Sequence, residues 1–263
     1  MGRVIAIANQ KGGVGKTTTA VNLSSCFAAM GKRVLLIDMD PQGNATSGLG
    51  VEKAKLNATI YQVLIGELPL DKAVMQTSIK DLDLLPANQS LAGAEVELVG
   101  AIAREVRLRK ALAPVLEQYE FILIDCPPSL SLLTLNALTA ADSVLLPLQC
   151  EYYAMEGLSQ LMQTVRLIEA NLNPGLSIEG ILLTMFDGRN NICHQVAEDV
   201  TEHFGWKVFE TVLSRNVRLS EAPSHGLPIN IYDPQSRGAI GYDTLAMEIL
   251  SRSAEAPAPK VEV

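Results

Sequence analysis

The chain has 263 residues, of which 48% are hydrophobic and 19% are charged, and this is enough to bury the core of one α/β domain. Its net charge of −8 argues against a uniformly basic surface that coats nucleic acid, although it leaves room for a local basic patch. No apolar run reaches the ~18 residues of a membrane-spanning helix, so we expect a cytoplasmic protein. The cysteines and histidines lack metal-ligand spacing, which predicts reduced, mostly buried thiols and no protein metal cage.

Apolar runs of strand length alternate with longer segments of helical periodicity along the chain. This alternation predicts a doubly wound α/β fold, a mostly parallel sheet with helices on both faces. Strands are expected at residues 3–8, 34–37, 82–85, 121–124, 143–147, 178–184 and 208–211. Helices are expected at residues 16–30, 58–65, 92–117, 130–140, 155–171, 190–204, 219–224 and 239–251. Residues 1–252 should form a single domain, and the Pro- and Ala-rich residues 253–263 a frayed tail.

The first expected strand runs directly into a glycine-rich loop, residues 10–18, with the sequence QKGGVGKTT. Its three glycines allow backbone N–H groups to turn toward a phosphate. Lys16 can neutralise the phosphate charge, and the hydroxyl of Thr17 can bind Mg²⁺. An alanine-rich segment of helical periodicity follows, so the loop also lies at a helix N-terminus, which favours anions. The segment therefore predicts a nucleotide-phosphate site.

The loop carries one lysine more than its own nucleotide requires. The strict phosphate-loop pattern has glycine at the position of Gln10, and here Gln10 is followed by Lys11. A second ammonium in so short a loop suggests a phosphate supplied from elsewhere, such as a facing subunit. Lys11 therefore separates this loop from that of an ordinary nucleotide-binding protein.

Two acidic residues follow the second expected strand, in the sequence DMDPQ at 38–42. Side chains alternate along a strand, so Asp38 and Asp40 should lie on the same side and face the loop-bound phosphates. Carboxylates beside a Mg²⁺-nucleotide can tune the surroundings of the metal or orient an attacking water. We expect Asp40 to orient the water because it lies where the strand ends. The alternative is that both acids belong to a turn and a helix cap.

A third acid, Asp125, follows the four apolar residues of the expected strand at 121–124. This is the Walker B arrangement, in which the carboxylate reaches Mg²⁺, usually through a water. The pattern is weak alone and strong when it is paired with Lys16 and Thr17. Two prolines follow Cys126 and stiffen a loop that we expect beside the γ-phosphate. No histidine flanks Cys126, so it is interpreted as a small packing residue and not as a nucleophile.

Four segments together resemble the ParA/Soj family of chromosome- and plasmid-partitioning ATPases, whose Walker A loop deviates from the strict pattern. They are residues 11–18 (KGGVGKTT), 38–44 (DMDPQGN), 125–129 (DCPPS) and 215–226 (RNVRLSEAPSHG). The resemblance covers residues 2 to about 250. It implies a P-loop fold and an ATPase that uses ATP and Mg²⁺.

The resemblance implies roles for individual residues. Lys11 would reach across a nucleotide-sandwich homodimer to the phosphates of the partner subunit, and Lys16 and Asp40 would complete the catalytic set. Thr17 would bind Mg²⁺ directly, and Asp125 would bind it through a water. The implied nucleotide contacts are Lys11, Gly12, Gly13, Val14, Gly15, Lys16, Thr17 and Thr18, with Asn216 at the adenine.

The resemblance also implies non-specific binding of double-stranded DNA by the ATP-bound dimer. Arg189 and Arg218 match basic positions of the DNA surface in the family, and both lie in or beside expected loops, where phosphate contacts need no base readout. A ParB-type centromere-binding protein is the implied partner. It would stimulate slow hydrolysis and so drive chromosome or plasmid segregation at the nucleoid.

Three other functions are considered. A membrane-associated, MinD-like positioning ATPase needs a basic amphipathic helix at its C-terminus, and residues 253–263 do not have this pattern, so no membrane is expected. An electron-transfer ATPase needs cysteines near the dimer axis, and Cys126 has no second cysteine nearby. A third possibility is a scaffold that binds ATP without hydrolysing it. Whether Asp40 supports phosphate release distinguishes this scaffold from an ATPase.

The acidic stretch 93–98 is either a partner-docking face or simply a helix start with favourable acids.

Overall fold

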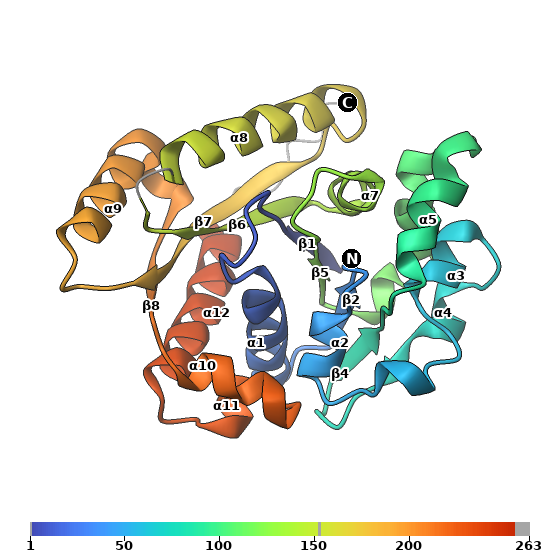
Figure 1. Cartoon of the computed structure of the whole chain (residues 1–263), viewed down its shortest axis with the longest axis horizontal. Helices are drawn as coiled ribbons and strands as arrows, with labels where there is room; N and C mark the ends of the chain where they lie inside the picture. Colours follow the sequence, from blue (N-terminus) through green and yellow to red (C-terminus); the bar gives the residue numbers. More distant parts are fainter. Residues whose placement is uncertain (1, 152–153, 256–263) are drawn as a thin grey trace.

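The computed structural model, which describes residues 2–151 and 154–255, is built around an eight-stranded sheet (Figure 1). The strands are β1 (Arg3–Ile7), β2 (Val34–Asp38), β3 (Met75–Gln76), β4 (Leu82–Leu85), β5 (Phe121–Asp125), β6 (Ser143–Gln149), β7 (Ser177–Phe186) and β8 (Val208–Ser214). Their spatial order is β3-β4-β2-β5-β1-β6-β7-β8, and all neighbours are parallel except β3 and β4. The expected doubly wound, mostly parallel α/β fold is confirmed.

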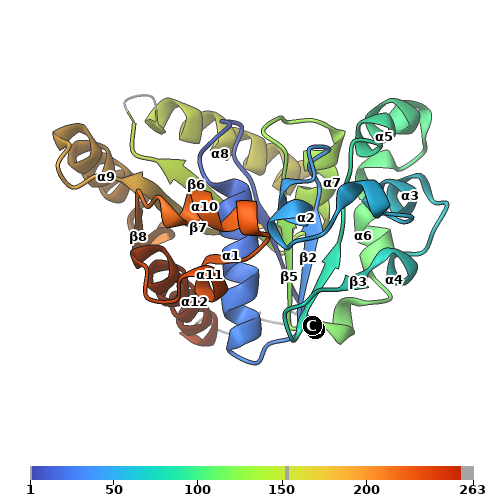
Figure 2. The same cartoon turned by 60° about the horizontal axis from the view of Figure 1, so that its bottom comes forward.

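Helices cover both faces of the sheet. One layer contains α1 (Lys16–Ala29), α2 (Asn44–Gly48), α10 (Arg218–Glu221), α11 (Ile229–Tyr232) and α12 (Arg237–Glu255). The other contains α3 (Ile60–Ile65), α4 (Leu70–Ala73), α5 (Leu91–Glu97), α6 (Arg107–Leu112), α7 (Leu132–Ala140), α8 (Ala154–Asn171) and α9 (Asn191–Phe204). Figure 2 turns the first layer toward the viewer, with α1 between α12 and α2. Across the described residues, none of these helices is long and apolar enough to cross a membrane.

The central strands owe their place to side chains that are apolar on both faces. In β1, Val4 and Ala6 pack into the core on one side of the sheet, and Ile5 and Ile7 pack into the core on the other. Every residue of β2 and β5 is buried as well. Parallel strands covered on both sides need such continuous apolar runs, which is why the sequence predicted them correctly.

The single long helix expected at residues 92–117 is wrong. The chain instead forms α5, an irregular stretch and the separate helix α6. Ala103 adopts a left-handed φ of 54°, which no continuous helix contains. The break is stabilised by the buried Asn136 of α7, whose amide donates to the carbonyl of Arg104 and accepts from the N–H of Leu108. A contact between distant segments therefore overrides helix propensity.

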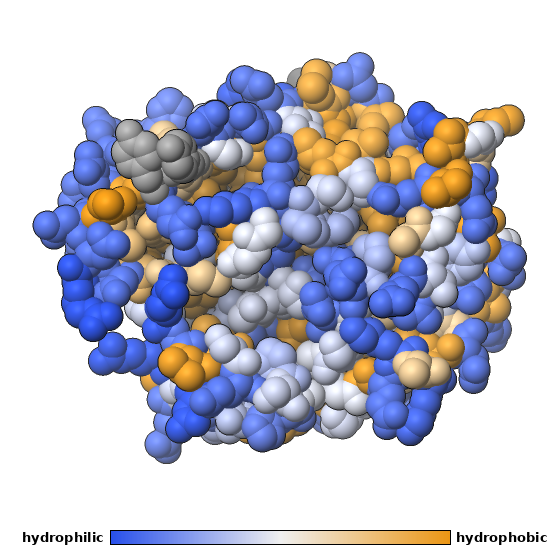
Figure 3. All heavy atoms as spheres, in the orientation of Figure 1, coloured by the Kyte–Doolittle hydropathy of each residue, from blue (hydrophilic) through white to orange (hydrophobic). Residues whose placement is uncertain are grey.

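The end of α5 and the irregular stretch after it also carry exposed apolar side chains. Val96, Val99 and Ile102 are all largely accessible to solvent. Figure 3 shows orange, hydrophobic surface at the upper right, over the part of the molecule where Figure 1 shows α5. The spacing of these side chains is close to a helical period, which helps to explain why the sequence predicted a continuous helix here.

The free edge of β8 is closed by side chains of α12. The Glu248 carboxylate accepts from the backbone N–H groups of Glu210 and Thr211, and Arg252 donates to the carbonyl of Val208. Covering an edge in this way prevents pairing with strands of other molecules. Helix α12 continues through Glu255, beyond its expected end at 251 and into the expected tail, while residues 256–263 lie outside the described residues.

Replacing Asn136 with alanine should lower the free energy of unfolding by about 2–4 kcal/mol, because buried backbone groups at the helix break lose their partners. Thr139, one turn further along α7, is the matched control, since its buried hydroxyl has no hydrogen-bond partner in the described part of the chain. Thr139→Val should therefore cost less than about 1 kcal/mol. Urea unfolding of both variants measures the difference, and equal losses would contradict this account of the break.

Candidate active site

The site begins where three adjacent central strands end. Ile7, at the end of β1, is in register with Asp125 at the end of β5, and Asp125 is in register with Asp38 at the end of β2. Strand β1 also lies between β5 and β6, so the chain leaves it at a point where the strand order reverses. Ligands of open parallel sheets bind at such points, beyond the carboxyl ends of the strands.

The loop after β1 has the geometry of an anion cradle. Gly13 and Gly15 have φ angles of 74° and 91°, values that favour glycine. Gly15 is the N-cap of α1, and no side chain caps this end of the helix, so its first N–H groups are available to an anion. A Cβ added to Gly12 or Gly13 would meet no atom within 4 Å, so the space above the loop is open.

The two lysines of the loop point in different directions. Lys16 is 6% exposed, and its ammonium donates to the carbonyl of Lys11 at 2.9 Å. Burial lowers the pKa of Lys16, while the nearby Asp125 partly opposes this shift. The ammonium of Lys11 instead forms an ion pair with Glu151, which follows β6, and the two side chains are 51% and 47% exposed. Lys16 thus belongs to the cradle, and Lys11 lies outside it.

Asp125 is a buried carboxyl group at the end of β5. It is fully buried, and neither of its oxygens has a hydrogen-bond partner of good geometry among the described residues. Burial raises its pKa well above the ordinary value, the charge of Asp38 adds to this, and the Thr17 hydroxyl opposes it. Such an arrangement fits a divalent cation, because a cation would offset the cost of burying the charge. The expected Mg²⁺ site, with Thr17 and Asp125, is thus chemically consistent with this geometry.

Asp38, the last residue of β2, and Asp40, just after it, have different surroundings. Asp38 accepts hydrogen bonds from the Thr46 N–H and hydroxyl at 2.8 and 2.7 Å, and from the N–H of Asp40 at 3.1 Å. Its carboxylate therefore holds the loop that carries Asp40. One Asp40 oxygen accepts from the N–H of Gln42 at 2.9 Å. Of the two, Asp40 has fewer hydrogen bonds and is the better candidate for a water-orienting carboxylate.

A cavity of about 180 Å³ lies beside the loop. Gly15 and Thr18 line it from the loop side, and Asn216 lines it from the segment after β8. Thr184 of β7 fixes this wall, because its hydroxyl donates to the carbonyl of Val14 at 2.9 Å. The structure therefore brings Asn216 next to the phosphate cradle.

The two arginines expected at DNA lie on neighbouring exposed segments. Arg189 follows β7 and forms a two-point pair with Asp187, at 3.0 and 2.9 Å. These hydrogen bonds lower the pKa of Asp187 to about 2. Arg218, at the start of α10, pairs with Glu221 at 2.8 Å and with Asp233 at 3.4 Å. Both guanidinium groups are accessible, and each is partly neutralised within the chain.

Sequence reasoning missed two residues of the site. Thr46 is fully buried and bridges Asp38 to the N–H of Ala87. Glu151 holds Lys11, and it could have been found by examining the polar residues after every strand, since it lies just beyond β6. The four cysteines are free and buried, in line with the expected reduced thiols.

Comparison with known proteins places this site in a family. A protein-family model described as an AAA domain matches residues 2–178. The sporulation initiation inhibitor protein Soj of Bacillus subtilis is 60% identical over 249 residues, covering 95% of this chain and 98% of that protein. The chromosome partitioning protein ParA of Myxococcus xanthus is 56% identical over 252 residues, covering 96% of this chain and 89% of that protein.

Solved structures agree with the fold. A cobyrinic acid a,c-diamide synthase from Mycobacterium smegmatis, solved with ADP and magnesium, has a TM-score of 0.86 at 38% identity and covers 97% of this chain and 96% of its own. The cell division ATPase MinD of Pyrococcus furiosus has a TM-score of 0.79 at 29% identity, covering 96% of this chain and all of its own.

The parallel sheet, the glycine loop and the acid at the end of β5 define a P-loop nucleoside triphosphatase. With relatives of such identity over nearly its whole length, the chain belongs to the ParA/Soj family of chromosome-partitioning ATPases. The family and enzyme class expected from the sequence are thereby confirmed. The expectation of ATP and Mg²⁺ agrees with the nucleotide and magnesium in the solved relative.

Asp125→Asn should raise the Tm of the nucleotide-free protein at pH 8 by about 3–8 °C, because it removes a buried carboxyl group whose ionisation the folded protein disfavours. The raised pKa means that the folded protein keeps this carboxyl protonated at pH values where the unfolded chain is ionised. Its stabilising contribution is therefore present at low pH and lost as the pH rises through the folded pKa. The difference between variant and parent should shrink toward pH 5.

Thermal unfolding with and without Mg²⁺-ATP supplies the second half of this test. Asp125→Asn should lose most of the Mg²⁺-dependent gain in Tm that ligand binding gives the parent. Asp40→Asn is the control: this carboxylate has a hydrogen-bond partner, so the substitution should not stabilise the protein and should keep the gain. A destabilised Asp125→Asn with an intact Mg²⁺ effect would remove Asp125 from the metal site.

Proposed function

We propose that the protein is an ATP-dependent DNA-partitioning ATPase that alternates between a monomer and an ATP-bound homodimer. The observation that carries the proposal is the different placement of the two loop lysines. Lys16 donates within the loop, whereas the Lys11 ammonium lies outside it on Glu151. A cation placed outside its own phosphate cradle can serve a phosphate bound by a facing subunit, and this is the role implied by the family resemblance.

In this function the chain holds ATP through the backbone of residues 12–18 and through Lys16, while Asn216 lies at the base. Thr17 would hold Mg²⁺ directly and Asp125 would hold it through a water, and the ion would supply positive charge beside the phosphates. Asp40 orients the attacking water, and its loop is kept in place by the hydrogen bonds of Asp38. Catalysis is then mainly positioning and electrostatic stabilisation, in keeping with slow hydrolysis.

The ATP-bound dimer binds double-stranded DNA without sequence preference through Arg189 and Arg218, and is therefore found at the nucleoid. Dimerisation doubles a modest basic patch, and the affinity for DNA grows with the number of phosphates engaged. A ParB-type centromere-binding protein stimulates hydrolysis and releases the dimer locally, which drives segregation. Residues 1–252 act as a single domain in this proposal. Support comes from the exposure of both arginines and from the Myxococcus xanthus relative named for chromosome partitioning.

Lys11→Ala should still bind ATP but remain a monomer, because its substitution leaves the phosphate cradle intact and removes the ammonium meant for the partner. Lys16→Ala should lose nucleotide binding itself. Light scattering after gel filtration, with ATP and with ADP, measures the oligomeric state, and calorimetry measures nucleotide affinity. A Lys11→Ala protein that dimerises with ATP as the parent does would refute the assigned role.

Arg189→Glu combined with Arg218→Glu should weaken ATP-dependent DNA binding at moderate salt by at least about tenfold and flatten its salt dependence. The measurement is best made in an Asp40→Ala background, which should retain ATP and so keep the dimer on DNA. Lys110→Glu with Arg166→Glu makes the same charge change at exposed positions of α6 and α8 and should have a smaller effect. Unchanged DNA affinity in the first pair would exclude this surface.

A further inference from the structure

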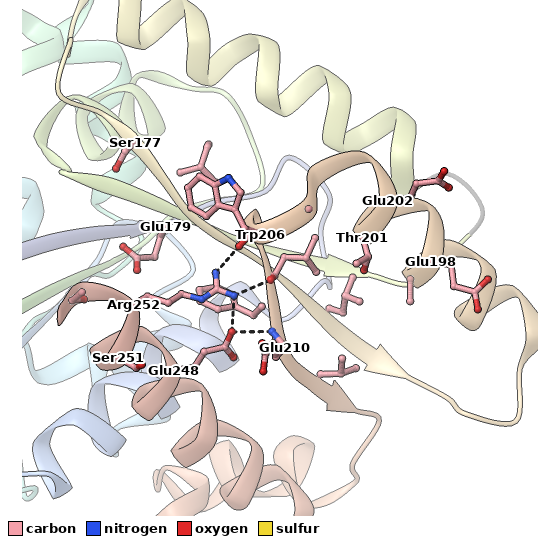
Figure 4. Close-up of a pocket in the computed structure, with 18 of the residues that line it drawn as sticks. Ser177, Glu179, Glu198, Thr201, Glu202, Trp206, Glu210, Glu248, Ser251 and Arg252 are labelled. Atoms are coloured by element: carbon pink, nitrogen blue, oxygen red, sulfur yellow. Dashed lines mark hydrogen bonds and ion pairs between the residues drawn. The ribbon is translucent and has the colours of Figure 1, made fainter. Parts of the chain in front are cut away.

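A large cavity among the described residues lies at the free edge of the sheet. It is a groove of about 1450 Å³ between α9, β8 and α12, and we call it the edge groove. Figure 4 shows labelled residues of α9 on one side and of α12 on the other, with Trp206 and Glu210 between them. The edge groove shares no lining residue with the cavity beside the phosphate loop.

The positive charges inside the edge groove are already matched by the protein. Arg252 donates to Glu248 at 2.6 Å and to two backbone carbonyls, those of Trp206 and Val208. Arg3 forms an ion pair with the nearly buried Glu179. Neither arginine is therefore available to attract an anion such as a nucleic-acid phosphate.

The edge groove is also closed to an added strand. Glu248 accepts from two successive backbone N–H groups of β8, at 2.8 and 3.0 Å, and Arg252 occupies the carbonyls. A ligand that paired with the β8 backbone would have to displace both side chains. Any occupant must instead bind through side-chain contacts.

The rim of the groove carries uncompensated negative charge. Glu198, Glu202 and Glu210 are exposed, and none forms an ion pair within residues 2–151 and 154–255. Glu198 and Glu202 are four residues apart on α9, where like charges destabilise a helix. Glu202 also lies in the last turn, where the helix dipole disfavours an acid. Acidic residues kept at positions where they destabilise their own helix are typical of a functional surface.

The same groove is lined by a large exposed aromatic side chain. Trp206 is 75% exposed, and Val212 on β8 is 39% exposed in the same groove. An accessible indole attracts cations to its face, and tryptophan and arginine are the residues most enriched at binding hot spots. Apolar surface framed by free carboxylates is complementary to a basic chain with apolar residues between its charges.

From this combination we propose that the edge groove docks a basic, extended segment of a partner protein. Its arginine or lysine side chains pair with Glu198, Glu202 and Glu210, and one of them stacks on Trp206. Duplex DNA and anionic membranes do not fit, because the same carboxylates repel phosphate. The proposal is independent of the ATPase cycle, since no residue of the groove belongs to the nucleotide loop.

The test uses the full chain without nucleotide or DNA, and a 12-residue peptide of alternating arginine and alanine as the probe. Trp206 is the only tryptophan of the chain, so its fluorescence reports on this groove alone. Titration should give a saturable change, which the corresponding glutamate–alanine peptide should not produce. A combined Glu198→Gln, Glu202→Gln, Glu210→Gln protein should bind about tenfold more weakly, as expected for three exposed ion pairs.

A matched control separates docking from general charge attraction. Glu67→Gln, Glu156→Gln, Glu169→Gln makes the same change in net charge at exposed positions away from the groove, and should alter the affinity less than about twofold. Trp206→Ala, followed by calorimetry, should also weaken peptide binding. Equal weakening by the two triple variants, or no saturation, would overturn the proposal.

Other occupants give different results, and each would overturn it. Duplex DNA that produced the same saturable change would identify a nucleic-acid surface. A fluorescence change that depended on protein concentration alone would identify a second copy of the chain. Peptide binding only after deletion of residues 256–263 would identify the end of the chain as the occupant.

Discussion

Two buried carboxylates at the ends of neighbouring strands set the arrangement of the site. Asp38 and Asp125 are register partners on β2 and β5, and both are fully buried. Burial raises the pKa of Asp38 to about 6 and raises that of Asp125 well above its ordinary value, and their proximity makes it costly to ionise both. The protein satisfies Asp38 with three hydrogen bonds and leaves Asp125 with none of good geometry. The Asp38 carboxylate thus holds the following loop in place, and the Asp125 carboxylate remains available to a cation.

The hydrogen bonds of Asp38 connect the nucleotide site to the next strand of the sheet. Thr46 donates to Asp38 and accepts from the N–H of Ala87, just beyond β4. The loop between Asp38 and Thr46 packs closely against this segment, because a Cβ on Gly43 would lie 2.7 Å from the Ala87 carbonyl oxygen. The segment carrying Asp40 is therefore held at both ends before any ligand binds, which is the preorganisation that positioning catalysis requires.

The features that the sequence predicted well are those encoded locally. The loop at 10–18 and the central strands follow from glycine spacing and apolar runs, which need no knowledge of distant residues. The helix break at Ala103 depends on Asn136, more than 30 positions away, so periodicity alone predicted one long helix. The hydrogen bonds of Asp38 could not be predicted from the sequence either, because its partner Thr46 comes next to it only when the following turn is folded.

The contact between Lys11 and Glu151 joins residues 140 positions apart, and its strength decides what it can do. Both side chains are about half exposed, and ion pairs of that kind contribute only about 0.2–1 kcal/mol. A phosphate in a partner subunit offers more charge and a drier setting, so exchanging Glu151 for it costs little. In the proposed cycle, Lys11 is therefore kept in a defined place in the monomer without being withheld from the dimer. A buried pair would have locked the lysine, and an unpaired one would have left it disordered.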